Sequence, residues 1–135
     1  MAYPYGTYQH SVRVTFNDPR RTLDVRGVIG SAPDHLKVIG LSPLGMTIFR
    51  IDEDFKSGAI KREFYLETMK RHETRFMFFY DMLKALMHAP KERREFQSHG
   101  ARFTLSEPDG QGVPRRILVD HPRVRLDIEV TGYEI

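Results

Sequence analysis

The chain has 135 residues, of which 40% are hydrophobic and 29% are charged, and its formal net charge is +3. This length and balance indicate one globular domain over residues 1–135, rather than a disordered, collagen-like or multi-span membrane chain. The sequence contains no cysteine, which excludes disulfide scaffolds, thiol catalysis and cysteine-ligated metals.

Five segments in the first half of the chain alternate hydrophobic and polar residues, as half-buried strands do. They are residues 8–16, 22–29, 35–41, 46–51 and 59–65. Short turn-forming sequences separate them, such as Asn-Asp-Pro at 17–19 and Ser-Pro-Leu-Gly at 42–45. Short strands joined by short turns predict an antiparallel meander.

The period of the pattern changes to that of a helix between residues 66 and 87. At about 100° per residue, one arc of about 120° holds Met69, His72, Phe76, Phe79, Tyr80, Leu83, Leu86 and Met87. Phe78 lies nearly opposite this arc, as in a helix with apolar contacts on two sides. Pro90 ends the segment. We predict one long helix, with His72 as a core histidine.

A charged connector at residues 91–98 precedes three further strands, at 101–105, 115–119 and 124–130. The order is therefore five strands, a helix and three strands. Because strands and helices do not alternate, doubly wound and barrel α/β folds are excluded. We predict a mainly β (α+β) domain, a curved antiparallel sheet that forms an open half-barrel with the long helix as a lid or plug.

Motifs for catalysis and metal binding are almost absent. The six histidines show none of the spacings that bind a metal, and no phosphate-binding glycine motif is present. The segment around Ser42 differs from the nucleophile elbow of hydrolases, because its second glycine comes one residue too late. We therefore expect no enzyme activity, no metal and no cofactor.

Two other classes of function stay open, an interaction module and a lipid-directed enzyme. Residues 61–102 carry 10 basic and 6 acidic groups, which favours anionic partners. No aromatic RNA-binding motif accompanies them, so we expect no nucleic acid as a partner. An enzyme acting on a lipid would need an acid–base pair, for which the helix offers His72 or His88 with Glu67 or Glu73.

The sequence VIGLSPLGMTIFRI at residues 38–51 forms an apolar strand, an SPLG turn and a returning strand. It resembles the corresponding hairpin of LolB, in the LolA/LolB superfamily of bacterial outer-membrane lipoprotein-handling proteins. Residues 76–90 are similar to the helix of uncharacterised lipoproteins related to LolB, and residues 132–135 look like the last strand of that group. The resemblance covers about residues 22–90 and, more weakly, the C-terminus.

The resemblance implies a half-barrel cavity that binds the acyl chains of lipids or lipoproteins, with no catalytic residue. We expect this cavity to be lined by Val25, Ile29, Leu36, Val38, Met46, Ile48, Phe76, Phe79, Met82, Leu83 and Leu86.

In that family the leucine of the turn protrudes and helps insertion into the membrane, a role that falls here on Leu44. Because Pro43 fixes one backbone angle and Gly45 allows a positive one, the turn is expected to be tight. The implied partners are acyl chains, a membrane surface and a LolA-like carrier. The implied location is the periplasm, with an outer-membrane anchor if an N-terminal lipoprotein signal has been removed.

Overall fold

The structure is a computed structural model that describes residues 3–17, 20–90 and 93–135. The predicted turn at Asp18 and Pro19 and the start of the predicted connector, Lys91 and Glu92, lie outside the described residues. No helix in the described part of the chain has the length and apolar character needed to span a membrane.

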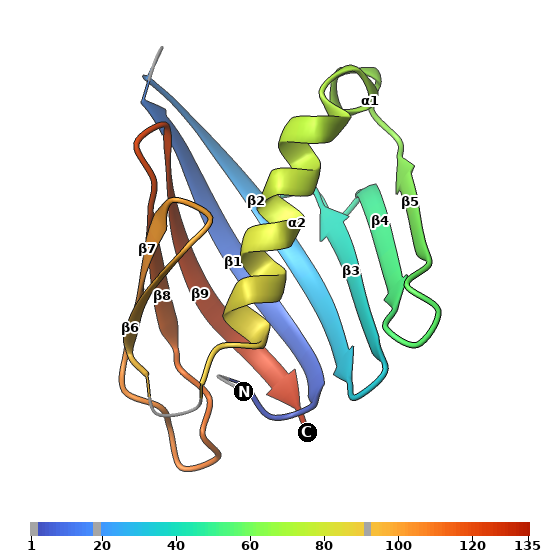
Figure 1. Ribbon diagram of the computed structural model, residues 1–135. Helices are drawn as coiled ribbons and strands as arrows, with labels where there is room; N and C mark the ends of the chain where they lie inside the picture. Colours follow the sequence, from blue (N-terminus) through green and yellow to red (C-terminus); the bar gives the residue numbers. More distant parts are fainter. Residues whose placement is uncertain (1–2, 18–19, 91–92) are drawn as a thin grey trace.

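Nine strands form one antiparallel sheet in the order β5-β4-β3-β2-β1-β9-β8-β7-β6 (Figure 1). The strands are β1 (Gly6–Asn17), β2 (Arg20–Ala32), β3 (His35–Leu41), β4 (Thr47–Asp54), β5 (Ile60–Phe64), β6 (Glu95–Ser98), β7 (Ala101–Leu105), β8 (Arg116–Asp120) and β9 (Val124–Glu134). Pairing of β1 with β9 joins the two meanders into one sheet. The mainly β, curved and open antiparallel sheet that the sequence predicts is thus confirmed.

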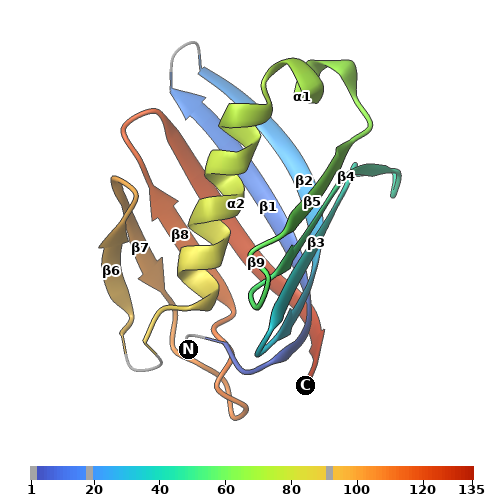
Figure 2. The same ribbon diagram turned by 45° about the vertical axis from the view of Figure 1, so that its right-hand side comes forward.

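Two helices, α1 (Glu67–Arg71) and α2 (Glu73–Met87), connect the two edge strands of the sheet in the chain. The sheet curves, and α2 lies across its concave face while α1 lies at one end (Figures 1 and 2). Since β5 and β6 are opposite edges of the sheet, the helical connection has to cross one of its faces, and in the structure it crosses the concave one.

The single long helix predicted from the sequence is wrong, because the helical segment breaks at His72. This residue has φ −116° and ψ 33°, so it ends α1 and precedes α2. Its side chain is exposed rather than part of the core. The helical arc that placed His72 among buried residues assumed a continuous helix, whereas His72 lies at the break between two helices.

A strand was missed at β6, where the sequence predicts only a charged connector. Phe96 stacks on Phe103 of β7 with the ring centroids 4.6 Å apart. The three other residues of β6 are polar, so one aromatic ring is the strand's whole hydrophobic signal. The charged residues on its N-terminal side hide that signal.

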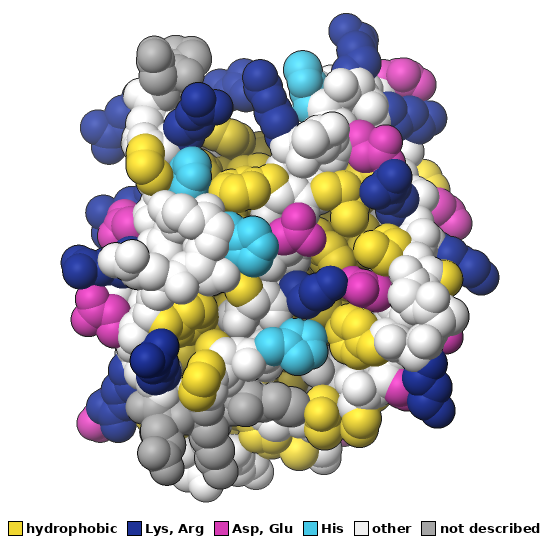
Figure 3. Space-filling model, viewed as in Figure 1, with side chains coloured by type: hydrophobic (Ala, Val, Ile, Leu, Met, Phe, Trp, Pro, Cys, Tyr) yellow, Lys and Arg dark blue, Asp and Glu magenta, His cyan; other side chains and the backbone are white. Residues whose placement is uncertain are grey.

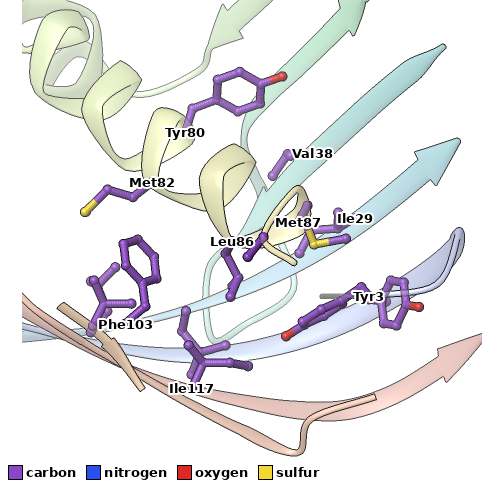
Figure 4. Packing of buried hydrophobic residues seen from close by; sticks show 14 of the residues in the cluster. Tyr3, Ile29, Val38, Tyr80, Met82, Leu86, Met87, Phe103 and Ile117 are labelled. Atoms are coloured by element: carbon purple, nitrogen blue, oxygen red, sulfur yellow. The ribbon is translucent and has the colours of Figure 1, made fainter. Parts of the chain in front are cut away.

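The core lies between α2 and the concave face of the sheet (Figure 4). In β9 every second residue from Val124 to Val130 is buried, as expected for a strand with one face in the core. The helix contributes Tyr80, Met82, Leu86 and Met87 as its buried side chains. These point toward strand residues from both meanders, so the helix packs against both halves of the sheet (Figure 4).

Two glycines of the concave face, Gly27 and Gly40, are paired across β2 and β3. A Cβ atom on Gly40 would lie 2.1 Å from Cε1 of Phe49, so the Phe49 ring packs directly over this glycine. For a Cβ atom on Gly27, the nearest atom would be Cβ of His10, at 3.8 Å. The first glycine is therefore required by packing, whereas a methyl group at the second would make an ordinary van der Waals contact.

Gly40→Ala is expected to lower the free energy of unfolding by about 1–3 kcal/mol, because the added methyl group must displace the Phe49 ring. Gly30→Ala is the control, since its Cβ would lie 3.9 Å from the nearest atom. Urea unfolding of both variants measures the difference. Equal losses of stability in the two variants would contradict the packing of Phe49 on Gly40.

Candidate ligand-binding cavity

A cavity of about 150 Å³ lies between α2 and the concave face of the sheet. Its walls are almost entirely apolar. Residues of β1, β2 and α2 supply most of the lining. The lining residues are His10, Val12, Val14, Phe16, Leu23, Val25, Arg26, Gly27, Ile29, Val38, Phe49, Ile51, Phe64, Phe76, Phe79, Tyr80, Met82, Leu83, Leu86, Phe103, Val119, Leu126 and Ile128. Packed protein interiors leave few voids, so an apolar space of this size is a feature to explain.

The two ends of the cavity differ in exposure. Ile29 and Leu86 are almost fully buried and form its closed end, whereas Leu23 is 48% exposed and Phe16 and Phe76 are half-buried at its open end. Figure 3 shows a hollow lined by hydrophobic side chains near the α1 end of the molecule, bordered by Lys and Arg side chains. The cavity therefore opens to solvent toward α1.

Eight of the eleven residues predicted to contact a ligand line this cavity. They are Val25, Ile29, Val38, Phe76, Phe79, Met82, Leu83 and Leu86. Leu36 is buried in the surrounding core but is not part of the lining. The hydrophobic pattern of the sequence thus indicates the helix face and the β2–β3 part of the wall.

The structure places the two other residues of that prediction, Met46 and Ile48, outside the cavity lining. Met46 is 66% exposed beside the β3–β4 turn. On β4 the lining residues are Phe49 and Ile51, because successive side chains of a strand point to opposite faces. Both faces of this strand carry apolar residues, so the hydrophobic pattern did not identify the inner one.

The wall also contains residues of β1, β7, β8 and β9 that the prediction did not include. These are Val12, Val14, Phe16, Phe103, Val119, Leu126 and Ile128. Except for Val119, whose strand has three consecutive apolar residues, each lies on the hydrophobic side of an alternating strand, so the signal was present. It could not be used without knowing that β9 pairs with β1 and brings the second meander to the same cavity.

A family model matches residues 7–134 of the chain, which include all of the described strands and helices except the first residue of β1. Its description is "Protein of unknown function (DUF3261)". The chain belongs to the DUF3261 family. No curated protein matches it significantly.

The cavity of this DUF3261 member contains one histidine that the sequence analysis did not single out. His10 is only 3% exposed, and its Nε2 atom has no hydrogen-bond partner among the described residues. Burial lowers the pKa of His10 to about 4, so the ring is neutral at pH 7. In the sequence, His10 occupies an inward position of the first alternating strand, which is the signal that could have identified it.

A polar network attaches α2 to the sheet beside the cavity. The buried carboxylate of Glu53 on β4 accepts a 2.8 Å hydrogen bond from the Tyr80 hydroxyl. It also accepts bonds of 3.0 and 3.1 Å from the ammonium group of Lys84. Burial and the bond to Glu53 raise the pKa of Tyr80. Because each of these groups is paired, the network fixes the position of the helix without an unsatisfied charge.

The turn predicted to reach the membrane is tight and exposed. The Gly45 N–H donates a 2.9 Å bond to the Ser42 carbonyl, and Gly45 has φ +84°, as expected. Leu44 is 90% exposed, so it protrudes rather than folding back on the sheet. The β3–β4 turn projects from the end of the sheet at which α1 lies (Figure 2).

Basic residues gather at the same end of the molecule as the cavity opening. Arg21 lies over the ring of Phe16, 5.6 Å from its centroid. Lys70 and Arg71 end α1, and Arg75 lies in the first turn of α2. The cavity opening, the protruding leucine and several basic side chains, of which Lys70 pairs with Glu67, therefore share one end of the fold.

Proposed function

We propose that this protein binds acyl chains of lipids or lipoproteins in the cavity and transfers them at a membrane of the bacterial cell envelope. The observation that carries the proposal is the apolar cavity that is open at one end. A void of this kind costs stability, because its lining loses contacts that a filled core would make. A protein that binds a hydrocarbon ligand needs such a space.

The volume of the cavity indicates how much of a ligand fits without movement. An apolar space of about 150 Å³ admits a molecule the size of benzene. A full acyl chain is longer, so α2 has to move away from the sheet as the chain enters. Burial of a dozen methylenes contributes about 10 kcal/mol, which is enough to offset disruption of packing along the helix. In this proposal α2 is the lid of the half-barrel.

The features of the α1 end fit a membrane-facing surface. An exposed leucine on a rigid turn gains about 1.5–3 kcal/mol when it enters an apolar phase. Basic side chains near the opening attract anionic head groups. The resemblance of residues 38–51 to the LolB hairpin supports the same role, with a LolA-like carrier as the protein partner and the periplasm as the location.

Leu44→Glu is expected to leave the melting temperature within about 2 °C of the wild type while abolishing binding to anionic liposomes. The side chain makes no buried contact that the substitution would remove. Ile135→Glu is the control, since Ile135 is 62% exposed at the C-terminus, away from α1 (Figure 1). Sedimentation with vesicles measures binding. Retained binding by Leu44→Glu, or equal loss in both variants, would contradict the role of the turn.

Mass spectrometry of lipids extracted from the natively purified protein tests the proposed function. Stoichiometric phospholipid, fatty acid or acylated peptide is expected in the wild type. A polar substitution in the cavity wall, Phe79→Ser, is expected to reduce that content by more than its effect on stability explains. Protein that is purified without any acyl-containing compound, and that does not take up a fluorescent fatty acid, would overturn the proposal.

A further inference from the structure

The inward-facing positions of β2 form a row that runs along the cavity and ends in a charged residue. From the closed end outward, every second residue of the strand belongs to this row, which consists of Ile29, Gly27, Val25, Leu23 and Arg21. The first four line the cavity, and exposure rises toward the opening, from 1% at Ile29 to 48% at Leu23. Arg21 therefore occupies the next inward position, just beyond the open end of the apolar wall.

An aromatic residue of the cavity wall holds Arg21 at this end. The guanidinium lies over the Phe16 ring, 5.6 Å from its centroid, and Phe16 is the residue opposite Arg21 in the β1–β2 pair. Phe16 lines the cavity and contacts Phe79 of α2 edge to face. A guanidinium over an aromatic ring keeps N–H donors for other partners, and no ion pair between described side chains includes Arg21. Its charge is therefore fixed beside the apolar space and available to a ligand.

The pairing of β2 explains why this end is open. Among the described strands, β3 pairs with β2 only over Arg26–Ala32, so the segment from Arg20 to Val25 has β1 on one side and no strand on the other. Leu23 and Arg21 lie in this segment and are both exposed. A head group that projects from the cavity opening can therefore reach Arg21 from solvent.

The interior of the cavity lacks a cation that could bind a charged head group. Three of its lining residues are ionisable, His10, Arg26 and Tyr80. Burial keeps His10 neutral at pH 7, and the Tyr80 hydroxyl donates its hydrogen bond to Glu53. Arg26 occupies an outward position of β2, so its side chain is directed to the opposite face of the sheet. Because an unpaired buried anion is costly, a carboxylate or phosphate has to remain at the opening.

We propose that Arg21 binds the anionic head group, a carboxylate or a phosphate, of the molecule whose acyl chain occupies the cavity. This inference rests on the proposed function and names the class of ligand, an anionic amphiphile that enters chain first. Both head groups present two oxygens to the planar fork of N–H donors of a guanidinium. The apolar wall thus binds the chain, and Arg21 distinguishes ligands by the charge of the head.

The test compares amphiphiles that share one chain and differ in the head, namely decanoate, decyl phosphate, 1-decanol and decyltrimethylammonium. Calorimetric titration at pH 7, without vesicles and below the micelle-forming concentrations, measures the affinity of each for the wild type and for Arg21→Gln. The substitution is expected to weaken binding of the two anions by about fivefold, as for an exposed ion pair of good geometry. Binding of 1-decanol is expected to stay unchanged, and that of the cation to become tighter. The larger of the two anion losses identifies the preferred head group.

Arg20→Gln is the matched control, because Arg20 is the preceding residue of β2, is exposed and faces the other side of the sheet. It removes the same charge next to the opening and is expected to retain all four affinities within about twofold. Equal loss of decanoate binding in the two variants, or equal changes for decanoate and 1-decanol in Arg21→Gln, would overturn the role of Arg21. Failure of the proposed function looks different, because then the wild type would bind none of the four compounds, neutral 1-decanol included, and the inference would fall with it.

Discussion

Gly27→Val is expected to abolish binding of a fluorescent fatty-acid probe while leaving the melting temperature unchanged or higher. Gly27 lines the cavity, and its added Cβ would approach no atom closer than 3.8 Å. The added side chain therefore enters space that the ligand needs, and its Cβ displaces no wall atom. Valine also favours the extended backbone more than glycine does, which adds to stability. Probe titration and thermal unfolding of the same sample measure both effects.

A matched control for this variant lies three residues along the same strand. Gly30 is on the opposite face of β2, and its added Cβ would lie 3.9 Å from Lys37 Cβ. Gly30→Val makes the same chemical change outside the cavity, so it is expected to retain probe binding. If Gly27→Val still binds the probe with wild-type affinity, the ligand lies elsewhere. If both variants lose binding equally, the loss does not come from filling the cavity.

Acidification from pH 7 to pH 4 is expected to remove about 3 kcal/mol of stability through His10 alone. The folded pKa is about 4, and the unfolded value is about 6.5. Between these values the unfolded chain binds a proton at this histidine while the folded protein does not. The unfolded state is therefore favoured progressively as the pH falls from about 6.5 to about 4.

The comparison that isolates His10 is between the wild type and His10→Leu. Urea unfolding at pH 7, 5.5 and 4 gives the pH dependence of each protein. Other carboxylates and histidines contribute to the pH dependence of stability in both proteins. Between pH 7 and pH 4, the free energy of unfolding is therefore expected to fall by about 3 kcal/mol less in His10→Leu than in the wild type. Parallel pH profiles for the two proteins would show that His10 titrates normally and is not enclosed in the apolar cavity.

The sheet could be predicted from the sequence because most of its strands have one polar face. In β9 the buried residues Val124, Leu126, Ile128 and Val130 alternate with charged ones, so position and orientation follow from the pattern. On β4 the pattern failed, because Ile48 on one face and Phe49 on the other are equally apolar. Here orientation depends on pairing with β3, in which Val38 lies opposite Ile51. The pairing of β4 with β3 cannot be read from the sequence of β4 itself.

The cavity itself could be predicted only through its helix and the β2–β3 wall. Its second wall comes from β7, β8 and β9, and their position depends on β1 pairing with both β2 and β9. Hydrophobic periodicity identifies residues that are buried, but it does not distinguish a filled core from an open space. The unpaired Nε2 of His10 likewise becomes apparent only when its neighbours are known.

Contacts between a bound acyl chain and methyl groups of the protein test the central claim most directly. Met82 and Leu83 line the cavity on α2, whereas Leu44 and Met46 are exposed at the β3–β4 turn. With ¹³C-labelled palmitate and methyl-labelled protein, nuclear Overhauser effects are expected from the chain methylenes to Met82 and Leu83. Effects confined to Leu44 and Met46, or no intermolecular effects at saturating palmitate, would contradict acyl-chain binding in the cavity.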